Sequence, residues 1–142
     1  AVGVRGIKLD AGDAVCDMVV TDGGGTLMTI CENGYGKRTS VSEYRSQTRG
    51  GKGIIDIRAT ERNGKVVNLL SVADDDEVMM ITKDGQIVRT EVGGISVIGR
   101  NTQGVRCISL RKGDKLVSVA RIPQEEPEAS GQEAGSEEEK ND

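Results

Sequence analysis

The sequence predicts an all-β protein built from repeated four-stranded sheets, and three observations lead to this prediction. Similar segments recur along the chain, and short runs rich in β-branched residues are separated by Gly and Asp/Asn turns. Twenty of the 142 residues are glycine, which indicates many tight turns. No stretch of ten residues shows the apolar period of about 3.6 residues that a long helix requires.

The repeat is clearest in three short sequence segments of seven residues each, called words below. When they are superposed on their first glycine, each has an isoleucine four residues later and Leu or Ile two residues after that. The words are GVRGIKL at 3–9, GKGIIDI at 51–57 and GVRCISL at 104–110. Two further words, ICENGYGKRT at 30–39 and ITKDGQIVRT at 81–90, share an Ile, a Gly and a final Arg-Thr. Repeats therefore start near 3, 51 and 104, with periods of 48 and 53 residues.

Each repeat is expected to hold four strands over about 50 residues, which is the size of a propeller blade. A single blade cannot bury both of its faces, so blades are expected to stack side by side. The chain supplies two full blades and half of a third, and it starts without Met, so we expect further blades upstream. Strands are expected near 4–9, 14–20, 26–31, 36–40, 53–58, 65–72, 77–82, 86–90, 105–110 and 115–121.

Charge divides the chain into a body and a tail. Residues 124–142 hold eight acids and one Lys, which leaves 18 basic and 15 acidic residues, a net charge of +3, in 1–123. A basic body with an acidic tail is typical of some nucleic-acid binders, although such tails also serve only to solubilise a protein. We expect the tail to be disordered and hypothesise that it competes with nucleic acid for the basic body.

Several function classes find no support in the sequence. There is no His, and Cys16, Cys31 and Cys107 lack the spacing of metal ligands, so no metal, cofactor-binding or catalytic residue is predicted. The cysteines are interpreted as small buried apolar residues in a reducing, intracellular compartment. The glycine-rich words lack the GxxxxGK[ST] pattern of a phosphate-binding loop. The acidic cluster 74–77 is expected to be an exposed turn, and no apolar run is long enough to span a membrane.

The strongest candidate site is the segment 35–53, YGKRTSVSEYRSQTRGGKG, which contains five basic residues and one acidic residue, Glu43. Its counterpart in the next repeat, 89–106, contains GRNTQG. Basic loops that recur at one place in each blade would form a stripe along the rim, which suits a bent duplex backbone. The alternative is that these are solvated turns whose arginines pair with carboxylates. The candidate DNA-binding residues are Lys37, Arg38, Arg45, Arg49, Lys52, Arg89, Arg100 and Arg106.

These words closely resemble the final blades of the C-terminal domain of the bacterial DNA gyrase A subunit. The resemblance covers 1–123, and its longest words are NGYGKRT at 33–39, TRGGKGI at 48–54, TERNGKVV at 60–67 and MMITKDGQIVRTEVGGISVIGRNTQGV at 79–105. It implies a six-bladed β-pinwheel, of which the chain would hold about two and a half blades, with strands exchanged between neighbours. It also implies that duplex DNA wraps around the basic rim without sequence specificity. The word SQTRGGKG at 46–53 is similar to a degenerate copy of the QRRGGKG box of that family.

The resemblance further implies a role without catalysis in this chain, within an ATP-dependent topoisomerase that introduces negative supercoils. ATP and Mg would be held by the cleavage core and the B subunit, in a heterotetramer of two A and two B subunits. The location would be the bacterial cytoplasm, in association with the nucleoid and not with a membrane. Two alternatives stay open: the C-terminal domain of a topoisomerase IV A-type subunit, and a propeller-type scaffold for protein interactions.

Overall fold

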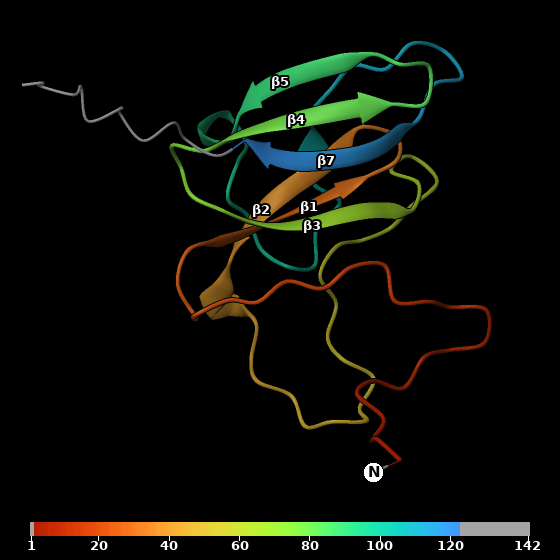
Figure 1. Ribbon diagram of the computed structural model, residues 1–142, viewed down its shortest axis with the longest axis vertical. Coiled ribbons are helices and arrows are strands. Elements are labelled where there is room, and N and C mark those ends of the chain that lie inside the picture. Colours follow the sequence, from red (N-terminus) through yellow and green to blue (C-terminus); the bar gives the residue numbers. More distant parts are fainter. Residues whose placement is uncertain (1, 123–142) are drawn as a thin grey trace, which may run out of the picture.

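The computed structural model describes residues 2–122, so the tail predicted to be disordered lies outside the described residues. The described part is all-β apart from two single-turn 3-10 helices (Figure 1). The elements are β1 (Thr26–Cys31), β2 (Tyr35–Ser40), η1 (Val41–Glu43), β3 (Val66–Val72), β4 (Glu77–Thr82), β5 (Ile87–Glu91), η2 (Val92–Gly94), β6 (Val105–Arg106) and β7 (Leu116–Ile122). No described helix is long and apolar enough to cross a membrane.

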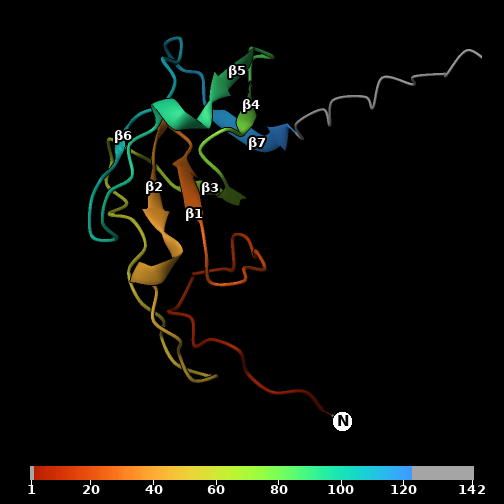
Figure 2. The same cartoon turned by 90° about the vertical axis from the view of Figure 1, so that its left-hand side faces the viewer.

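The strands form two antiparallel sheets that lie one above the other (Figure 2). The first sheet has the order β3-β1-β2-β6, and the second has the order β5-β4-β7. The two sheets repeat one pattern, because β1 pairs with β3 as β4 pairs with β7. Even the irregularity recurs, since the register shifts between Ile30 and Cys31 in the first sheet and between Ile81 and Thr82 in the second. The predicted β-repeat is therefore confirmed at the level of individual residue pairs.

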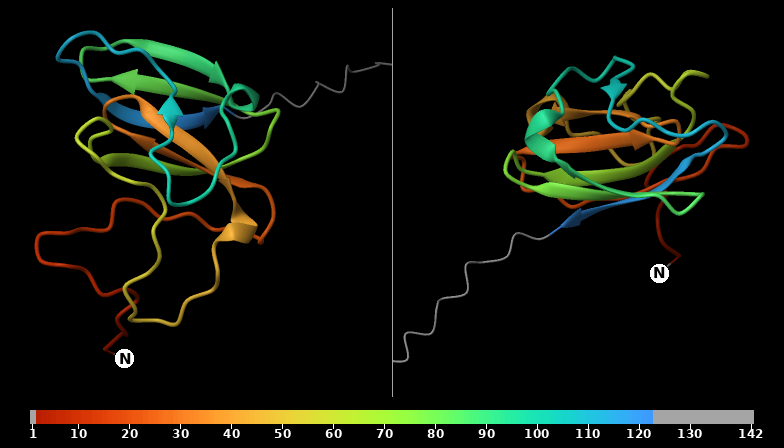
Figure 3. Two further views of the ribbon diagram at one scale, coloured as in Figure 1. Left: turned by 180° about the vertical axis from the view of Figure 1, so that it is seen from behind. Right: turned by 90° about the horizontal axis from the view of Figure 1, so that it is seen from above.

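Each sheet combines strands from different copies of the sequence repeat. In the first sheet β1 and β2 belong to the first copy, β3 to the second and β6 to the third. The chain between η2 and β6 crosses the outside of β2 to deliver that last strand (Figure 3). A strand thus pairs with neighbours that are one or two repeats away in the sequence.

This exchange explains where the strand prediction is wrong. Segments 4–9, 14–20 and 53–58 form no strands, and the β-bridge described for them joins Ile7 to Gly51 in isolation. By the pairing seen in the second and third copies, their partners would be strands of preceding repeats, and no described residue fills those places. The expected strand 105–110 is reduced to β6, because only Val105 and Arg106 pair with β2. The other six strands lie within about one residue of their expected bounds.

The hydrophobic core lies between the two sheets. Met28 and Ile30 of β1 face Val78 and Met80 of β4, and all four are fully buried. Since no Phe or Trp is present, the core consists of Val, Ile, Leu and Met, as the composition requires. Its remaining buried members are Val72, Val92, Ile95, Ile108, Leu116 and Val119.

Backbone conformation refines the alignment of the repeats. Gly3, Gly53 and Gly104 all have φ between 74° and 79°, whereas Gly51 has no positive φ. Because only glycine adopts this region at low cost, the three are conformational equivalents. The second copy is therefore aligned two residues later than the superposition on Gly51 suggested.

Candidate nucleic-acid interface

One loop near the first sheet carries three exposed basic side chains. It runs from Tyr44 to Asp56, is called the basic loop below, and extends away from both sheets (Figure 1). Arg45, Arg49 and Lys52 are exposed, and none of these side chains has a hydrogen-bond or ion-pair partner among the described residues. Such unpaired cations are available to an external anion.

The N-terminal segment lies alongside the basic loop and adds two cations to it. Gly50 N donates to Gly6 O at 2.8 Å, and Lys8 N donates to Gly51 O at 2.8 Å. These bonds place the stretch from Arg5 to Lys8 next to the glycines between Arg49 and Lys52, and all four cations are exposed. Arg5 and Lys8 were not among the residues predicted to bind DNA. Because Arg5 shares its place after a repeat glycine with Arg106, the repeat could have identified it.

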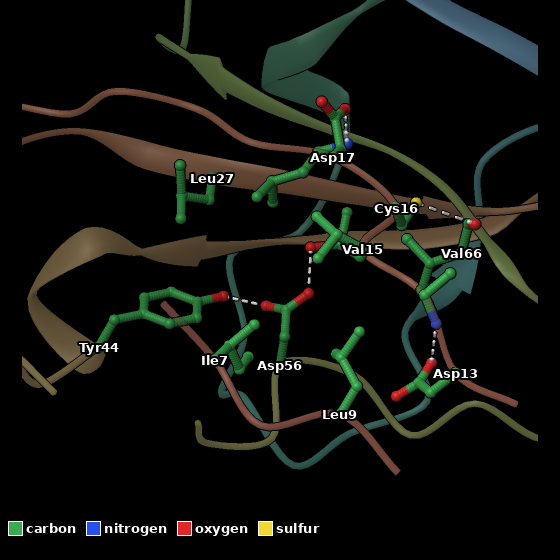
Figure 4. A pocket seen from close by; sticks show the side chains of 13 residues that line it. Ile7, Leu9, Asp13, Val15, Cys16, Asp17, Leu27, Tyr44, Asp56 and Val66 are labelled. Carbon is green, nitrogen blue, oxygen red and sulfur yellow. Dashed lines mark hydrogen bonds between the residues drawn. The ribbon is translucent and has the colours of Figure 1, made fainter. Parts of the chain in front are cut away.

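The carboxylate of Asp56 joins the two ends of the basic loop. The Tyr44 hydroxyl donates to Asp56 Oδ1, and the Thr29 hydroxyl of β1 donates to Asp56 Oδ2 at 2.6 Å (Figure 4). Burial and the hydrogen bond to Asp56 raise the pKa of Tyr44 above its ordinary range, so this hydroxyl stays protonated. We call these three residues and Lys37, whose contacts follow, the neck of the basic loop.

The structure corrects the prediction for Lys37, which was expected on an exposed rim. Its side chain is 0% exposed, and its ammonium donates to three backbone carbonyl oxygens. These are Asp56 O, Gly99 O at 2.6 Å and Arg100 O at 2.7 Å. Burial lowers the pKa of Lys37, and the negative charges of Asp56 and Glu43 oppose that effect. An ammonium in this position links the end of the basic loop to the chain at Gly99 and Arg100, and it has no surface exposed to an external anion.

Arg38 is also buried, at 4% exposure, and the expectation that it faces solvent is wrong as well. Its guanidinium donates to Ile95 O at 2.9 Å and pairs with Asp74 at 2.6 Å. The physical reason is the chain after η2, which covers β2 and makes a parallel bridge between Arg38 and Val97.

The three predicted cations beyond the basic loop have different surroundings. Arg100 is half-buried and donates to Ile55 O at 2.8 Å, which places it beside the end of the basic loop. Arg89 is exposed and paired with Glu77 on the second sheet. Arg106 is exposed and donates to the Tyr35 hydroxyl at 3.0 Å. Arg38 and Arg89 hold equivalent places in the two sheets, yet one is buried and the other is exposed. The predicted cations therefore do not form the regular exposed stripe that the hypothesis required.

Tyr35 forms a second cationic cluster with Arg62 and Arg106. The Arg62 guanidinium lies 4.2 Å from the centre of the Tyr35 ring, and that of Arg106 lies 5.6 Å away. The hydrogen bond from Arg106, with the two positive charges, lowers the pKa of Tyr35. Both tyrosines thus have packing or hydrogen-bonding roles within the fold.

The remaining polar clusters favour no metal site. No group of three or more His, Cys, Asp or Glu within residues 2–122 has the arrangement of a metal site. In the acidic cluster, Asp74 pairs with Arg38, Asp76 accepts from Ala73 N at 2.8 Å, and Glu77 pairs with Arg89.

A cavity of about 430 Å³ lies between the N-terminal segment and the first sheet (Figure 4). Its apolar lining includes Ile7, Leu9, Val15 and Leu27. Cys16 also lines it, and its thiol is exposed, contrary to the prediction that all three cysteines are buried.

Comparison with known proteins agrees with this geometry. The family described as "DNA gyrase C-terminal domain, beta-propeller" matches residues 1–22, 25–73 and 76–123, and the second and third matches each run from one sequence repeat into the next. The DNA gyrase A protein of Escherichia coli is 49% identical over 120 residues, which are 84% of this chain and 14% of that protein. Its counterpart in Staphylococcus epidermidis is 44% identical over 128 residues, 89% of this chain and 14% of its own. The chain therefore spans about one seventh of the length of these curated relatives.

Solved structures give the same assignment. A structure of a DNA gyrase A C-terminal domain superposes with a TM-score of 0.79 at 32% identity, covering 85% of this chain and 41% of that one. The C-terminal domain of a DNA topoisomerase IV superposes with a TM-score of 0.75 at 21% identity over 84% of this chain and 38% of that one, a likeness of fold alone. With its repeated sheets, its exchanged strands and these matches, the chain belongs to the DNA gyrase C-terminal domain family of β-propellers.

Proposed function

We propose that this chain binds and wraps duplex DNA as part of a gyrase A protein, and that the basic loop is its main contact with the phosphate backbone. The observation that carries the proposal is that Arg45, Arg49 and Lys52 are exposed without a partner among the described residues, beside Arg5 and Lys8. Cations in such a row displace the counterions of DNA when they bind successive phosphates. The described residues contain no recognition helix, so the contacts would read the backbone and not the bases.

Arg100 extends this surface, since it lies beside the end of the basic loop. Arg106 would add a separate contact beside Tyr35, at the other end of β2. Lys37 and Arg38 support the surface from inside and make no contact with DNA. Arg89 is assigned no contact, because it is paired with Glu77 on the other sheet.

The wider roles are part of the same proposal. The whole protein would act with gyrase B in a heterotetramer, in the cytoplasm, and ATP and Mg would be bound outside this chain. No catalytic residue is assigned here. The identity with gyrase A proteins supports this assignment over topoisomerase IV, for which only the fold agrees.

The test replaces the three loop cations together by Gln and measures duplex binding over a series of salt concentrations. Each lost phosphate contact should make the log–log salt slope shallower by about 0.9, for all DNA sequences alike. The matched control replaces the exposed Lys83, Arg111 and Lys112, at the turn end of the second sheet, and so removes the same charge. Equal slopes for the two triple variants would contradict the proposal. If the affinity for duplex DNA does not depend on salt concentration, the alternative function, a scaffold for protein interactions, would be favoured.

A further inference from the structure

The basic loop is held mainly at its two ends. Between Tyr44 and Asp56 its backbone is tied to the N-terminal segment through Gly50 and Gly51, and to the Arg100 guanidinium through Ile55 O, next to the end of the loop. Gly50 and Gly53 have φ of 80° and 79°, which permits sharp changes of direction but gives no rigidity. The order of the loop therefore depends on the neck.

The neck converges on one residue, Asp56. Its carboxylate accepts from the hydroxyls of Tyr44 and Thr29, and its carbonyl accepts from the Lys37 ammonium. Thr29 is 1% exposed and Lys37 is 0% exposed, so two of the three donors belong to the buried part of the first sheet. Hydrogen bonds to a charged acceptor with little exposure to water are stronger than those between neutral groups. Only the bond from Tyr44 joins the start of the loop to its end.

Closing the loop at its neck should lower the entropic cost of binding DNA through the loop cations. A loop of this length that is open at its neck distributes Arg45, Arg49 and Lys52 over many positions, and DNA binding would then have to order them. A loop that is already closed presents them in one arrangement, which lowers the entropic cost of binding. Lys37 also links the basic loop to the chain between η2 and β6, because its ammonium donates to Gly99 O and Arg100 O. Arg100 is thereby fixed next to the same surface.

We propose that the neck is a positioning device, in which Tyr44 and Asp56 hold the basic loop in the conformation that meets the DNA backbone. Neither residue needs to touch DNA. This inference rests on the proposed function, because the loop is positioned for a duplex. A purely structural neck would stabilise the fold and leave the affinity for DNA unchanged.

The first measurement follows the loop itself without DNA. The variant Tyr44→Phe keeps the ring and removes the one hydroxyl that joins the two ends. Trypsin cleaves after Arg and Lys, so mass spectrometry can time cleavage after Arg49 and Lys52 within the loop. We expect cleavage about tenfold faster in the variant, because proteolysis follows the population of the open loop. Thr29→Val is a second variant with the same expected direction.

A matched control lies on the same strand. Thr26→Val also removes a threonine hydroxyl from β1, but that hydroxyl donates to Val72 O at 3.0 Å and does not touch the loop. Its loop cleavage should stay within about twofold of the wild type, although its thermal stability also falls. If Thr26→Val opens the loop equally, the effect is one of general stability and the proposal is wrong.

The second measurement is duplex affinity at fixed salt. Tyr44→Phe should bind about three- to tenfold more weakly with the salt slope of the wild type, because no cation is removed. Unchanged cleavage in Tyr44→Phe would show that the neck does not hold the loop closed. Faster cleavage with unchanged affinity would show that the neck has no role in DNA binding. A wild-type chain that does not bind duplex overturns the proposed function and the DNA part of this inference. The cleavage result would still decide whether the neck holds the loop.

Discussion

The two sheets place equivalent residues in opposite environments. Register equates the pair Met28 and Arg38 of the first sheet with Met79 and Arg89 of the second. β1 is buried at five of its six positions, whereas β4 alternates between buried and half-buried and β5 is buried nowhere. The first sheet is covered on its β2 side by β6 and the chain from η2, and no described segment covers β5 in that way. Whether a side chain in one repeat is buried or exposed thus depends on the repeat that follows and covers it.

The largest effect should come from the two equivalent methionines. Met28→Ala is expected to lower the free energy of unfolding by about 3 kcal/mol, because Met28 is fully buried between the sheets and its loss leaves a cavity. Met79→Ala, at a half-buried position, should cost about 1 kcal/mol. Urea unfolding of the two variants measures the difference. Equal losses would show that the second sheet is covered as completely as the first.

The equivalent turn glycines sharpen the comparison. Gly34 and Gly85 have φ of 88° and 89°, so alanine costs about 1 kcal/mol of backbone strain at either. At Gly34 a Cβ would also lie 2.6 Å from Ile108 O, whereas at Gly85 it would meet nothing within 4 Å. Gly34→Ala should therefore lose about 2 kcal/mol or more, and Gly85→Ala about half of that. Thermal melts of the two proteins decide the point, and a larger loss at Gly85 would contradict the assigned packing.

The equivalent arginines give a third comparison of the two sheets. Arg38→Ala removes a buried side chain and leaves Ile95 O without its donor, so we expect a loss of about 2 kcal/mol. Arg89→Ala removes an exposed pair with Glu77 and should change stability by about 0.5 kcal/mol at most. Urea midpoints of both variants at low and high salt give the result. If Arg89→Ala proves the more costly, the second sheet has a cover that the described residues do not show.

The smallest effect concerns the thiols. Burial raises the pKa of Cys31 and of Cys107 to about 11, whereas Cys16 is exposed, although its pKa is also raised. Near pH 8 a chromogenic disulfide reagent should react first with Cys16 and slowly with the other two. Above about pH 9 the unfolded state loses the thiol protons and the folded state keeps them, so stability should fall as the pH rises toward 11. Rapid labelling of all three thiols in the folded chain would argue against the burial of Cys31.

Residues 37–56 show which parts of the candidate site could be predicted from the sequence. The run of cations at 37–52 correctly indicated the exposed Arg45, Arg49 and Lys52. It gave no sign that Lys37 and Arg38 are buried, because the residues that cover them come from 95–100, half a chain away. Asp56 carried no signal at all, since its partners Thr29 and Tyr44 are 27 and 12 residues distant in sequence.

The sequence by itself determined the all-β class, the period of the repeat and the turns at Gly34 and Gly85, because these depend on local backbone preference and on side-chain alternation. Only the tertiary structure decided which strands pair, and it left 4–9, 14–20 and 53–58 without the neighbours that a strand needs. A strand is completed by hydrogen bonds from another segment, so strand propensity predicts a tendency that the fold must satisfy elsewhere. Burial of a charge follows the same logic, since Lys37 and Arg38 are stabilised by carbonyl groups that belong to the next repeat.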